Sequence, residues 1–300
     1  MRKALRGSMK QQDAYKILAI FLGLTMVFSI FAYIFIGPNP VNDEQTNEET
    51  LKEKYDPEFW VIRQDFESIS DALNMTPVGV EYANYVDLES MPPQMVQWAR
   101  QDLPLIAEVD TIYNSSTNKM YYANLRDGKN GSFLLLSTMY PEKNEFQYMV
   151  VPNSYPPILM RQEQSISGLY NIMGNPTILS LPQTAIESLE IIYSLNKTNT
   201  SYDKYEGLLR KVPPAPFQSI DSNVTFARQY YMGVNFNNGS YERMTAYLDV
   251  NSSTLKNLTK FKANSTEKGF TEYNITKSGN YTVVRIISPD MFRVLMEEYT

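Results

Sequence analysis

Residues 17–36, ILAIFLGLTMVFSIFAYIFI, are the stretch from which the rest of the chain can be interpreted. These twenty residues carry no charge, and thirteen of them are Ile, Leu, Phe or Val. A helix of this length spans about 30 Å, which matches the thickness of the hydrocarbon core of a bilayer. The stretch therefore predicts a single transmembrane helix.

The charges on either side of this helix predict its orientation. Five basic residues and one acidic residue precede it: Arg2, Lys3, Arg6, Lys10 and Lys16, with Asp13. Four acidic residues follow it before the next basic one: Asp43, Glu44, Glu48 and Glu49. Because Lys and Arg stay on the cytoplasmic side, residues 1–16 are expected to form a cytoplasmic tail, and the bulk of the chain lies outside the cell membrane.

Two alternatives bear on the same segment. A cleaved secretory signal would have a shorter apolar region that ends at a small-residue cleavage site. Here the uncharged run is twenty residues long and ends in Ile36-Gly37-Pro38. Ala19 and Gly23 form one small-xxx-small pair, which leaves a homodimer through the membrane helix open.

The composition of the outer part excludes several chemistries. Subtracting the tail's five basic and one acidic residues from the totals of 27 and 33 leaves 22 basic and 32 acidic residues, a net charge near −10. That charge argues against binding nucleic acid. The chain has no Cys and no His, so disulfides, thiol nucleophiles, Ser-His-Asp triads and ordinary zinc sites are excluded. No metal and no cofactor are expected.

Asparagine supplies a second strong signal. The N-x-[ST] acceptor pattern for N-glycosylation occurs at Asn74, Asn114, Asn130, Asn196, Asn199, Asn223, Asn238, Asn251, Asn257, Asn264, Asn274 and Asn280. Nine of these twelve sites lie beyond residue 195. Since the predicted topology puts this region outside the cell, we expect these sites to be glycosylated; the alternative is a polar surface rich in Asn and Thr that carries no glycans.

Beyond the membrane helix the chain is predicted to be α+β. Residues 37–55 are polar and acidic and are expected to form a stalk. Asp56-Pro57 then resembles a helix start, with apolar residues at helical spacing as far as Leu73. A first α+β lobe over 56–163 and a second over 164–300, with an insertion near 198–221, are expected to be similar and possibly duplicated, with antiparallel sheets and flanking helices.

The expected duplication depends on five features in the same order. The segment SISDALN (68–74) resembles SISGLYN (165–171). A predicted strand (78–86 or 176–181) and a predicted helix (92–103 or 182–195) follow in each lobe. Each lobe then has two predicted hairpins, at 110–125 and 131–152 in the first lobe and at 230–250 and 268–289 in the second. A further helix is expected over 253–263.

Three sets of residues are candidates for chemistry or binding. Ser116 with Lys119, and Ser253 with Lys256, have the spacing of a Ser–Lys nucleophile. The carboxylates near predicted strands could serve glycoside hydrolysis: Glu81, Asp87, Glu108 and Asp110. Tyrosines could stack on a sugar ring: Tyr121-Tyr122 and Tyr230-Tyr231. Because neighbours on a strand point to opposite faces, at most one tyrosine of each pair could do so.

These observations favour a non-catalytic, glycosylated, membrane-anchored protein that binds a protein partner in the envelope or in a membrane complex. Two alternatives are a small-molecule binding or sensing module, with its ligand between the lobes, and a carboxylate-based hydrolase of the envelope. In its composition, with one N-in span, many acceptor sites and no Cys, the chain resembles archaeal cell-surface proteins.

Overall fold

The computed structural model describes residues 59–127, 130–194 and 199–296. The predicted cytoplasmic tail, membrane helix and stalk lie outside these residues, as does the acceptor Asn196. Within the described part of the chain, no helix is both long and apolar enough to cross a membrane. Helices account for 28% and strands for 38% of the structure, which confirms the α+β class.

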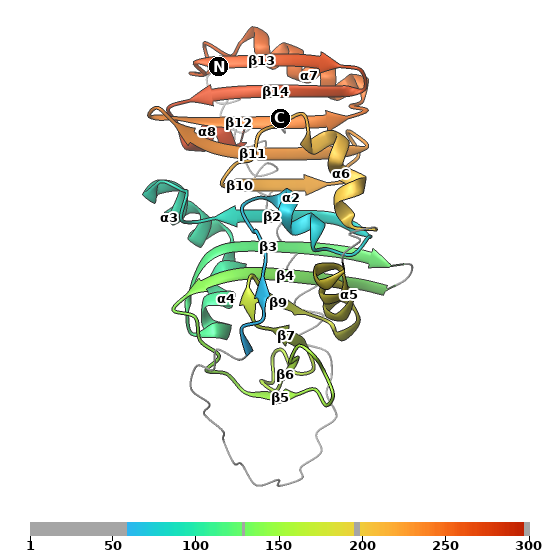
Figure 1. Ribbon diagram of the computed structural model, residues 1–300. Coiled ribbons are helices and arrows are strands. Elements are labelled where there is room, and N and C mark those ends of the chain that lie inside the picture. The colour runs from blue at the N-terminus through green and yellow to red at the C-terminus, as the bar shows by residue number, and fades with distance from the viewer. Residues whose placement is uncertain (1–58, 128–129, 195–198, 297–300) are drawn as a thin grey trace, which may run out of the picture.

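Twelve strands form one antiparallel sheet that runs the length of the molecule (Figure 1). From edge to edge the order is β13 (Glu272–Ser278), β14 (Tyr281–Ser288), β12 (Ser240–Leu248), β11 (Gln229–Asn237), β10 (Phe217–Asp221), β2 (Val80–Asp87), β3 (Ser116–Asp127), β4 (Asn130–Tyr140), β9 (Thr177–Ser180), β7 (Tyr170–Ile172), β6 (Leu159–Arg161) and β5 (Tyr148–Val150). At the usual strand spacing the sheet is about 50 Å long.

The sheet consists of two halves with the same strand order. Five strands of each half share an arrangement, in which three adjacent strands come first in the chain and the last of two later strands pairs with the third: β2, β3, β4, β7, β9 and β10, β11, β12, β13, β14. β5 and β6 extend the first half beyond β7 and have no counterpart in the second. A helix precedes each set, α2 (Ile69–Asn74) before β2 and α6 (Ser201–Leu209) before β10, and these helices contact each other. The halves meet where Phe217–Asp221 pairs with Tyr82–Val86.

The residue correspondence predicted for the repeat is wrong. Residues 68–74 form the cap and body of α2, whereas 165–171 form turns that lead into β7. Residues 201–221, expected to be part of an insertion, form α6 and the central strand β10. The expected boundary after residue 163 falls between β6 and β7, which are hydrogen-bonded neighbours in the sheet. The element equivalent to α2 is therefore α6 and not residues 165–171, and the strand equivalent to β2 is β10 and not residues 176–181.

Two of the four predicted hairpins are confirmed, β11–β12 and β13–β14. The hairpin expected over 110–125 is wrong, because α4 (Pro104–Tyr113) continues to Asn114, whose left-handed backbone (φ 48°) ends the helix. The hairpin expected over 131–152 is also wrong, since β4 pairs with β3 and β9. The predicted helices at 92–103, 182–195 and 253–263 correspond to α3 (Pro93–Asp102), α5 (Pro182–Tyr193) and α7 (Ser252–Ala263).

The helix expected from Asp56 to Leu73 is confined to α2. The Ser68 hydroxyl accepts from the backbone N–H of Asp71 and donates to its carboxylate, so the helix starts at Ile69. Upstream, β1 (Ile62–Arg63) is extended and pairs in parallel with β8 (Gly174–Asn175). The Ile62 side chain is buried in this strand pair. Its apolar character therefore comes from the strand, although its position also fits the helical spacing of the predicted helix.

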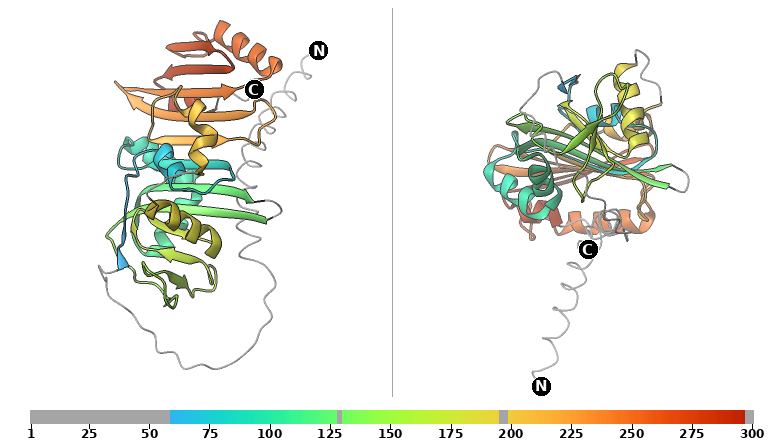
Figure 2. Two further views of the ribbon diagram at one scale, coloured as in Figure 1. Left: turned by 45° about the vertical axis from the view of Figure 1, so that its right-hand side comes forward. Right: turned by 90° about the horizontal axis from the view of Figure 1, so that it is seen from below.

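Helices cover both faces of the sheet. One face carries α2, α5 and α6, and the other carries α3, α4, α7 and α8 (Met291–Met296) (Figures 1 and 2). Each face has its own apolar core, with Tyr121 on one side of β3 and Tyr122 on the other. Because both faces are covered over most of the sheet, its strands are apolar on both sides, which weakens the alternation that sequence analysis relies on.

Candidate functional site

Two grooves open on the face covered by α2, α5 and α6, both in the half of the sheet that contains β5. Groove 1, of about 650 Å³, lies between α5 and the end of the β3–β4 hairpin. Groove 2, of about 760 Å³, lies beside β1 and the adjoining ends of β3 and β4.

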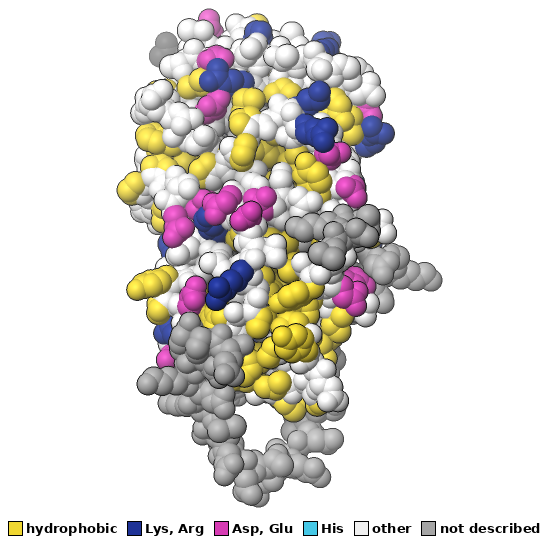
Figure 3. Space-filling model, viewed as in Figure 1, with side chains coloured by type: hydrophobic (Ala, Val, Ile, Leu, Met, Phe, Trp, Pro, Cys, Tyr) yellow, Lys and Arg dark blue, Asp and Glu magenta, His cyan; other side chains and the backbone are white. Residues whose placement is uncertain are grey.

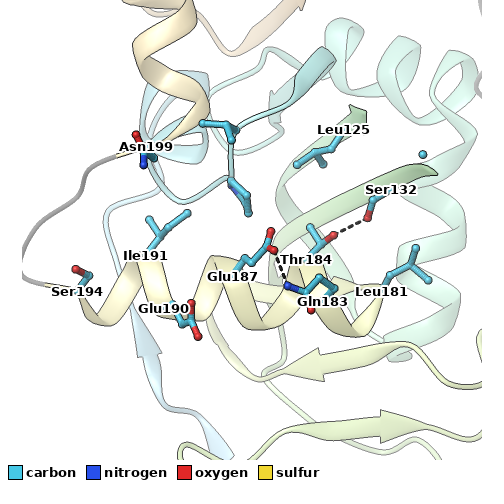
Figure 4. A pocket seen from close by; sticks show the side chains of 13 residues that line it. Leu125, Ser132, Leu181, Gln183, Thr184, Glu187, Glu190, Ile191, Ser194 and Asn199 are labelled. Carbon is cyan, nitrogen blue, oxygen red and sulfur yellow. Dashed lines mark hydrogen bonds between the residues drawn. The ribbon is translucent and has the colours of Figure 1, made fainter. Parts of the chain in front are cut away.

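Groove 1 has an apolar floor and polar walls. Leu125, Leu181 and Ile191 line it. The hydroxyls of Ser132 and Thr184 share a hydrogen bond of 2.6 Å between β4 and α5 (Figure 4). Its two carboxylates, Glu187 and Glu190, point in different directions, and Glu187 accepts a 2.6 Å hydrogen bond from Gln183 (Figure 4). The groove can therefore hold an apolar group against α5, but its carboxylates are not arranged as an acid–base pair.

Groove 2 is centred on an ion-paired lysine. The Lys119 Nζ atom lies 2.5 Å from the Glu67 carboxylate and 3.9 Å from that of Asp87, and the Lys119 side chain is only 12% exposed. Asn118 donates to Glu89 at 2.9 Å on the rim. In Figure 3, acidic side chains surround a basic one at the level of β2. The arrangement suits recognition of a polar partner more than a chemical step, because the amine is held by carboxylates.

A third polar cluster joins the two halves. Lys204 of α6 donates to the Val80 carbonyl and to the Ser222 hydroxyl, both at 2.8 Å. Burial lowers the pKa of Lys204 and raises the pKa of the Asp221 carboxyl nearby. The Tyr205 hydroxyl donates to the same Val80 carbonyl at 2.9 Å. These contacts fix α6 to the first strand of the other half, which is a structural role.

The first of the two predicted Ser–Lys pairs is not assembled. Ser116 accepts from Arg100 at 3.1 Å, whereas Lys119 is held by Glu67 and Asp87. Ser253 and Lys256 are both exposed on α7, outside both grooves.

The four candidate carboxylates have separate surroundings. Glu81 and Asp87 lie at opposite ends of β2, and Glu81 pairs with Arg126 at 3.3 Å. Asp87 accepts from the Ser90 hydroxyl at 2.7 Å and from two backbone N–H groups of the following turn. Asp110 pairs with Arg100 at 2.6 Å. Glu108 is exposed on α4, where partial burial raises its carboxyl pKa. Among the described residues no two of these four share a hydrogen-bonding partner.

The paired tyrosines belong to the core, so the sugar-stacking expectation is wrong for them. Tyr121, Tyr122, Tyr230 and Tyr231 are all buried. The Tyr121 hydroxyl lies 3.2 Å from that of Thr76, and the Tyr231 hydroxyl donates to the Pro213 carbonyl at 3.2 Å. Neighbouring tyrosines do point to opposite faces, but each face is covered.

Most of the glycan acceptor sites that the structure describes are on the surface. Nine side chains are exposed: Asn114, Asn199, Asn223, Asn238, Asn251, Asn257, Asn264, Asn274 and Asn280. Asn74 differs, because its amide donates to the Ser70 carbonyl at 3.0 Å and the hydroxyl of its Thr76 is buried. The backbone of Asn130 is in β4, and its side chain lies outside the described part. Seven of the exposed sites belong to the half from β10 to β14.

Neither groove can be predicted from the sequence patterns. Each depends on the β3–β4 hairpin, which brings Leu125 and Ser132 to α5 and Lys119 to β1. The sequence predicts a hairpin over 110–125, which divides the actual strand Ser116–Asp127 between a turn and a shorter strand. The strands that pair with β3 therefore cannot be inferred from the sequence. The available signal was the amphipathic helix α5, whose Thr184 and Ile191 face groove 1.

Comparisons with known proteins assign no family. No protein-family model and no curated protein matches the chain. Two solved structures, crystal forms III and IV of TP0453, are similar at TM-scores of 0.42 and 0.41, each with 7% identity. They cover 76% and 74% of this chain, and 98% and 95% of their own chains. Similarity at this level carries no argument about fold or function.

Proposed function

We propose that this protein is a single-pass, N-glycosylated membrane protein whose external part is a non-catalytic binding module for a protein partner in the envelope or in a membrane complex. The membrane helix at 17–36 and the acceptor sites carry the first part of the proposal. Grooves 1 and 2 support the second part, the binding of a protein partner. Groove 1 can hold an apolar group and groove 2 presents charged side chains, and the described side chains that line them are not arranged as a catalytic set.

The distribution of acceptor sites is the observation that supports a binding surface most directly. No acceptor pattern occurs between residues 131 and 195, the segment that supplies α5 and most of groove 1. Exposed sites instead concentrate in the half from β10 to β14, and Asn199 lies on the border of groove 1. Glycans at these positions would shield the half from β10 to β14 and leave groove 2 open to a partner, whereas a glycan at Asn199 would cover one side of groove 1.

Membrane anchoring and glycosylation are tested together on protein from native membranes. Anchoring predicts that the full chain stays with the membrane after an alkaline carbonate wash. Glycosylation predicts a mass above the 34.5 kDa of the bare chain. Release by the wash, or a mass equal to that of the bare chain, would contradict the corresponding part of the proposal.

The binding surface is tested by single-cysteine cross-linking, which this cysteine-free chain makes unambiguous. Glu190→Cys puts a thiol at groove 1, and Lys277→Cys puts one on the exposed strand β13 at the other end of the sheet. With a bifunctional reagent in native membranes, we expect one discrete cross-linked partner from Glu190→Cys and none from Lys277→Cys. Equal labelling of many proteins from both positions would contradict a specific surface at groove 1.

A further inference from the structure

Exposed apolar side chains gather at the β5 end of the sheet. Met149 and Val150 of β5 are 50% and 44% exposed, Tyr155 of the following loop is 98% exposed, and Tyr193 at the end of α5 is 54% exposed. Only eight large apolar side chains are exposed in the described part of the chain, and these are four of them. We call this group the β5 tip. Hydrophobic side chains also gather over the lower part of the face seen in Figure 3.

The loop that presents Tyr155 is held in place by its own hydrogen bonds. The Ser154 hydroxyl donates to the Val151 carbonyl at 2.9 Å and accepts from the Ile158 N–H at 3.1 Å. The Val151 N–H donates to the Ile158 carbonyl at 2.9 Å. Tyr155 lies close enough to Tyr193 for its charge to raise the pKa of the Tyr193 phenol, to which burial contributes more. The exposed tyrosine is therefore held by a closed loop.

The surroundings of the β5 tip suit an apolar partner. Residues 148–160, YMVVPNSYPPILM, contain no charged side chain in a chain that is 20% charged overall. The same region lies within the segment 131–195, which has no glycan acceptor pattern. An apolar surface free of charge and of glycan sites is typical of a contact surface.

The chain connects this end of the sheet to the predicted membrane helix. Phe59, the first described residue, packs edge-on against Tyr148 of β5 with ring centroids 6.0 Å apart. The Tyr193 hydroxyl donates to the Val61 carbonyl at 3.3 Å. Residues 37–58 join this attachment to the predicted span, so the chain from the span enters the described part at the β5 end, with β13 at the opposite end of the sheet.

We propose that the β5 tip rests on the outer surface of the bilayer that holds the predicted membrane helix, with Tyr155 and Tyr193 at the level of the lipid headgroups. The inference rests on the anchor of the proposed function. Tyrosine suits this position because its ring is apolar and its hydroxyl is polar. A second copy pairing edge to edge fits less well, since β5 has three residues and is followed by Pro152, features that oppose strand addition.

The test places a reporter on the tip of the full chain. Tyr155→Cys, labelled with an environment-sensitive fluorophore, is compared with Ser278→Cys on β13, which is exposed at the opposite edge. Each protein is reconstituted into phosphatidylcholine vesicles with plain or brominated acyl chains. We expect brominated lipid to reduce the emission of the label at 155 and to leave that at 278 unchanged. Because Tyr155 is 98% exposed, its replacement removes no core contact.

Three other outcomes are distinct. If the protein does not float with the vesicles, the membrane anchor itself fails, and the proposed function fails with it. If it floats but the two labels are quenched equally or not at all, the contact between tip and bilayer is overturned while the anchor stands. If spin labels at 155 in different copies lie close together, the tip is an interface between copies, which also overturns the inference.

Discussion

Arg161 of β6 is fully buried although its side chain is charged. Its guanidinium makes two hydrogen bonds to the Glu163 carboxylate, at 2.7 and 3.0 Å, and donates to Asn171 at 2.8 Å. It also donates to the Ile112 carbonyl at 3.0 Å and lies 3.8 Å from the centre of the Phe146 ring. One side chain thus connects α4, β6 and β7.

Removing this guanidinium should destabilise the fold strongly. Arg161→Ala leaves the Glu163 carboxylate without its cation and leaves the Asn171 oxygen with the Tyr113 hydroxyl as its remaining donor. Breaking a buried pair from one side costs about 3–5 kcal/mol, and the lower end applies because the Glu163 side chain is 30% exposed. Arg126→Ala is the matched control, because Arg126 also pairs with a glutamate but is 65% exposed; its loss should be below about 1 kcal/mol. Urea unfolding of the two variants measures the difference. Equal losses would show that Arg161 is not structurally special.

At the scale of elements, the parallel pair β1–β8 depends on a close backbone approach. A Cβ atom at Gly174 would lie 2.4 Å from the Ile62 Cβ and 2.6 Å from the Ile62 nitrogen and oxygen. The N–H groups of Val61 and Gln64 donate across this pair, to Met173 and Asn175, at 3.1 and 2.9 Å. β1 can therefore dock only against a residue without a side chain.

Gly174→Ala should detach β1 from β8 while the main sheet remains. We expect the amide hydrogens of residues 61–64 to exchange faster with solvent, with little change in β3 or β11. Gly131→Ala is the control, since a Cβ there meets nothing within 4 Å. Hydrogen exchange followed by mass spectrometry distinguishes the two variants. Unchanged exchange at 61–64 in Gly174→Ala would contradict the steric argument.

The acceptor sites differ between elements in how far their side chains are free for a glycan. Asn238 lies at the β11–β12 turn with φ 52°, followed by Gly239 with φ 79°, so a glycan there extends into solvent. Ser240→Ala removes the acceptor hydroxyl but keeps the turn residues, and should lower the mass of the native protein by one glycan.

Asn74 should be unmodified in the folded protein, because its amide and the Thr76 hydroxyl are engaged. Glycopeptide mass spectrometry tests both, and an occupied Asn74 would contradict the second expectation.

The elements that the sequence predicted well are those specified locally. The β11–β12 hairpin has alternating residues around Asn238-Gly239, a pair that favours the two-residue hairpin turn, and α5 begins with Pro182 and has apolar residues at helical spacing. β10 was missed because five residues buried on both faces show no alternation. The grooves were missed because they depend on which strands become neighbours, and Lys119 and Glu67 are 52 residues apart.

At the scale of the whole molecule, five strands of each half have the same order, with β2 and β10 as the equivalent first strands. The halves differ in their final helices, since α5 covers the face with α2 and α6 whereas α8 covers the other. This difference explains why only the first half has groove 1.

The many buried tyrosines make the whole fold sensitive to alkali. Burial raises the pKa of Tyr82 and Tyr113 to about 12 and raises those of Tyr121 and Tyr231 further, from an ordinary value of 10.0. Between about pH 10 and 12 the unfolded chain loses these protons and the folded chain keeps them, so stability falls as pH rises. For Tyr113 a shift from 10.0 to about 12 corresponds to about 3 kcal/mol.

We therefore expect cooperative unfolding above about pH 10, with the buried tyrosines ionising as the fold is lost. Tyrosinate absorbance and circular dichroism, recorded on the same samples, measure the two events. A smooth ionisation of all 22 tyrosines with unchanged circular dichroism would contradict the expectation.

The single twelve-stranded sheet has a mechanical consequence. Tension applied between its two ends, for example by a cell surface pulling on β13 while β5 is held, acts across the strands and along their hydrogen bonds. Because the ladders then carry the same load in series, the ladder with the fewest residue pairs separates first. The ladder that joins the halves, between β2 and β10, has five residue pairs, whereas the ladder between β6 and β7, near the β5 end, has two. Under tension the β5 end would therefore come apart before the two halves do, and the contact between α2 and α6 further reinforces the junction of the halves.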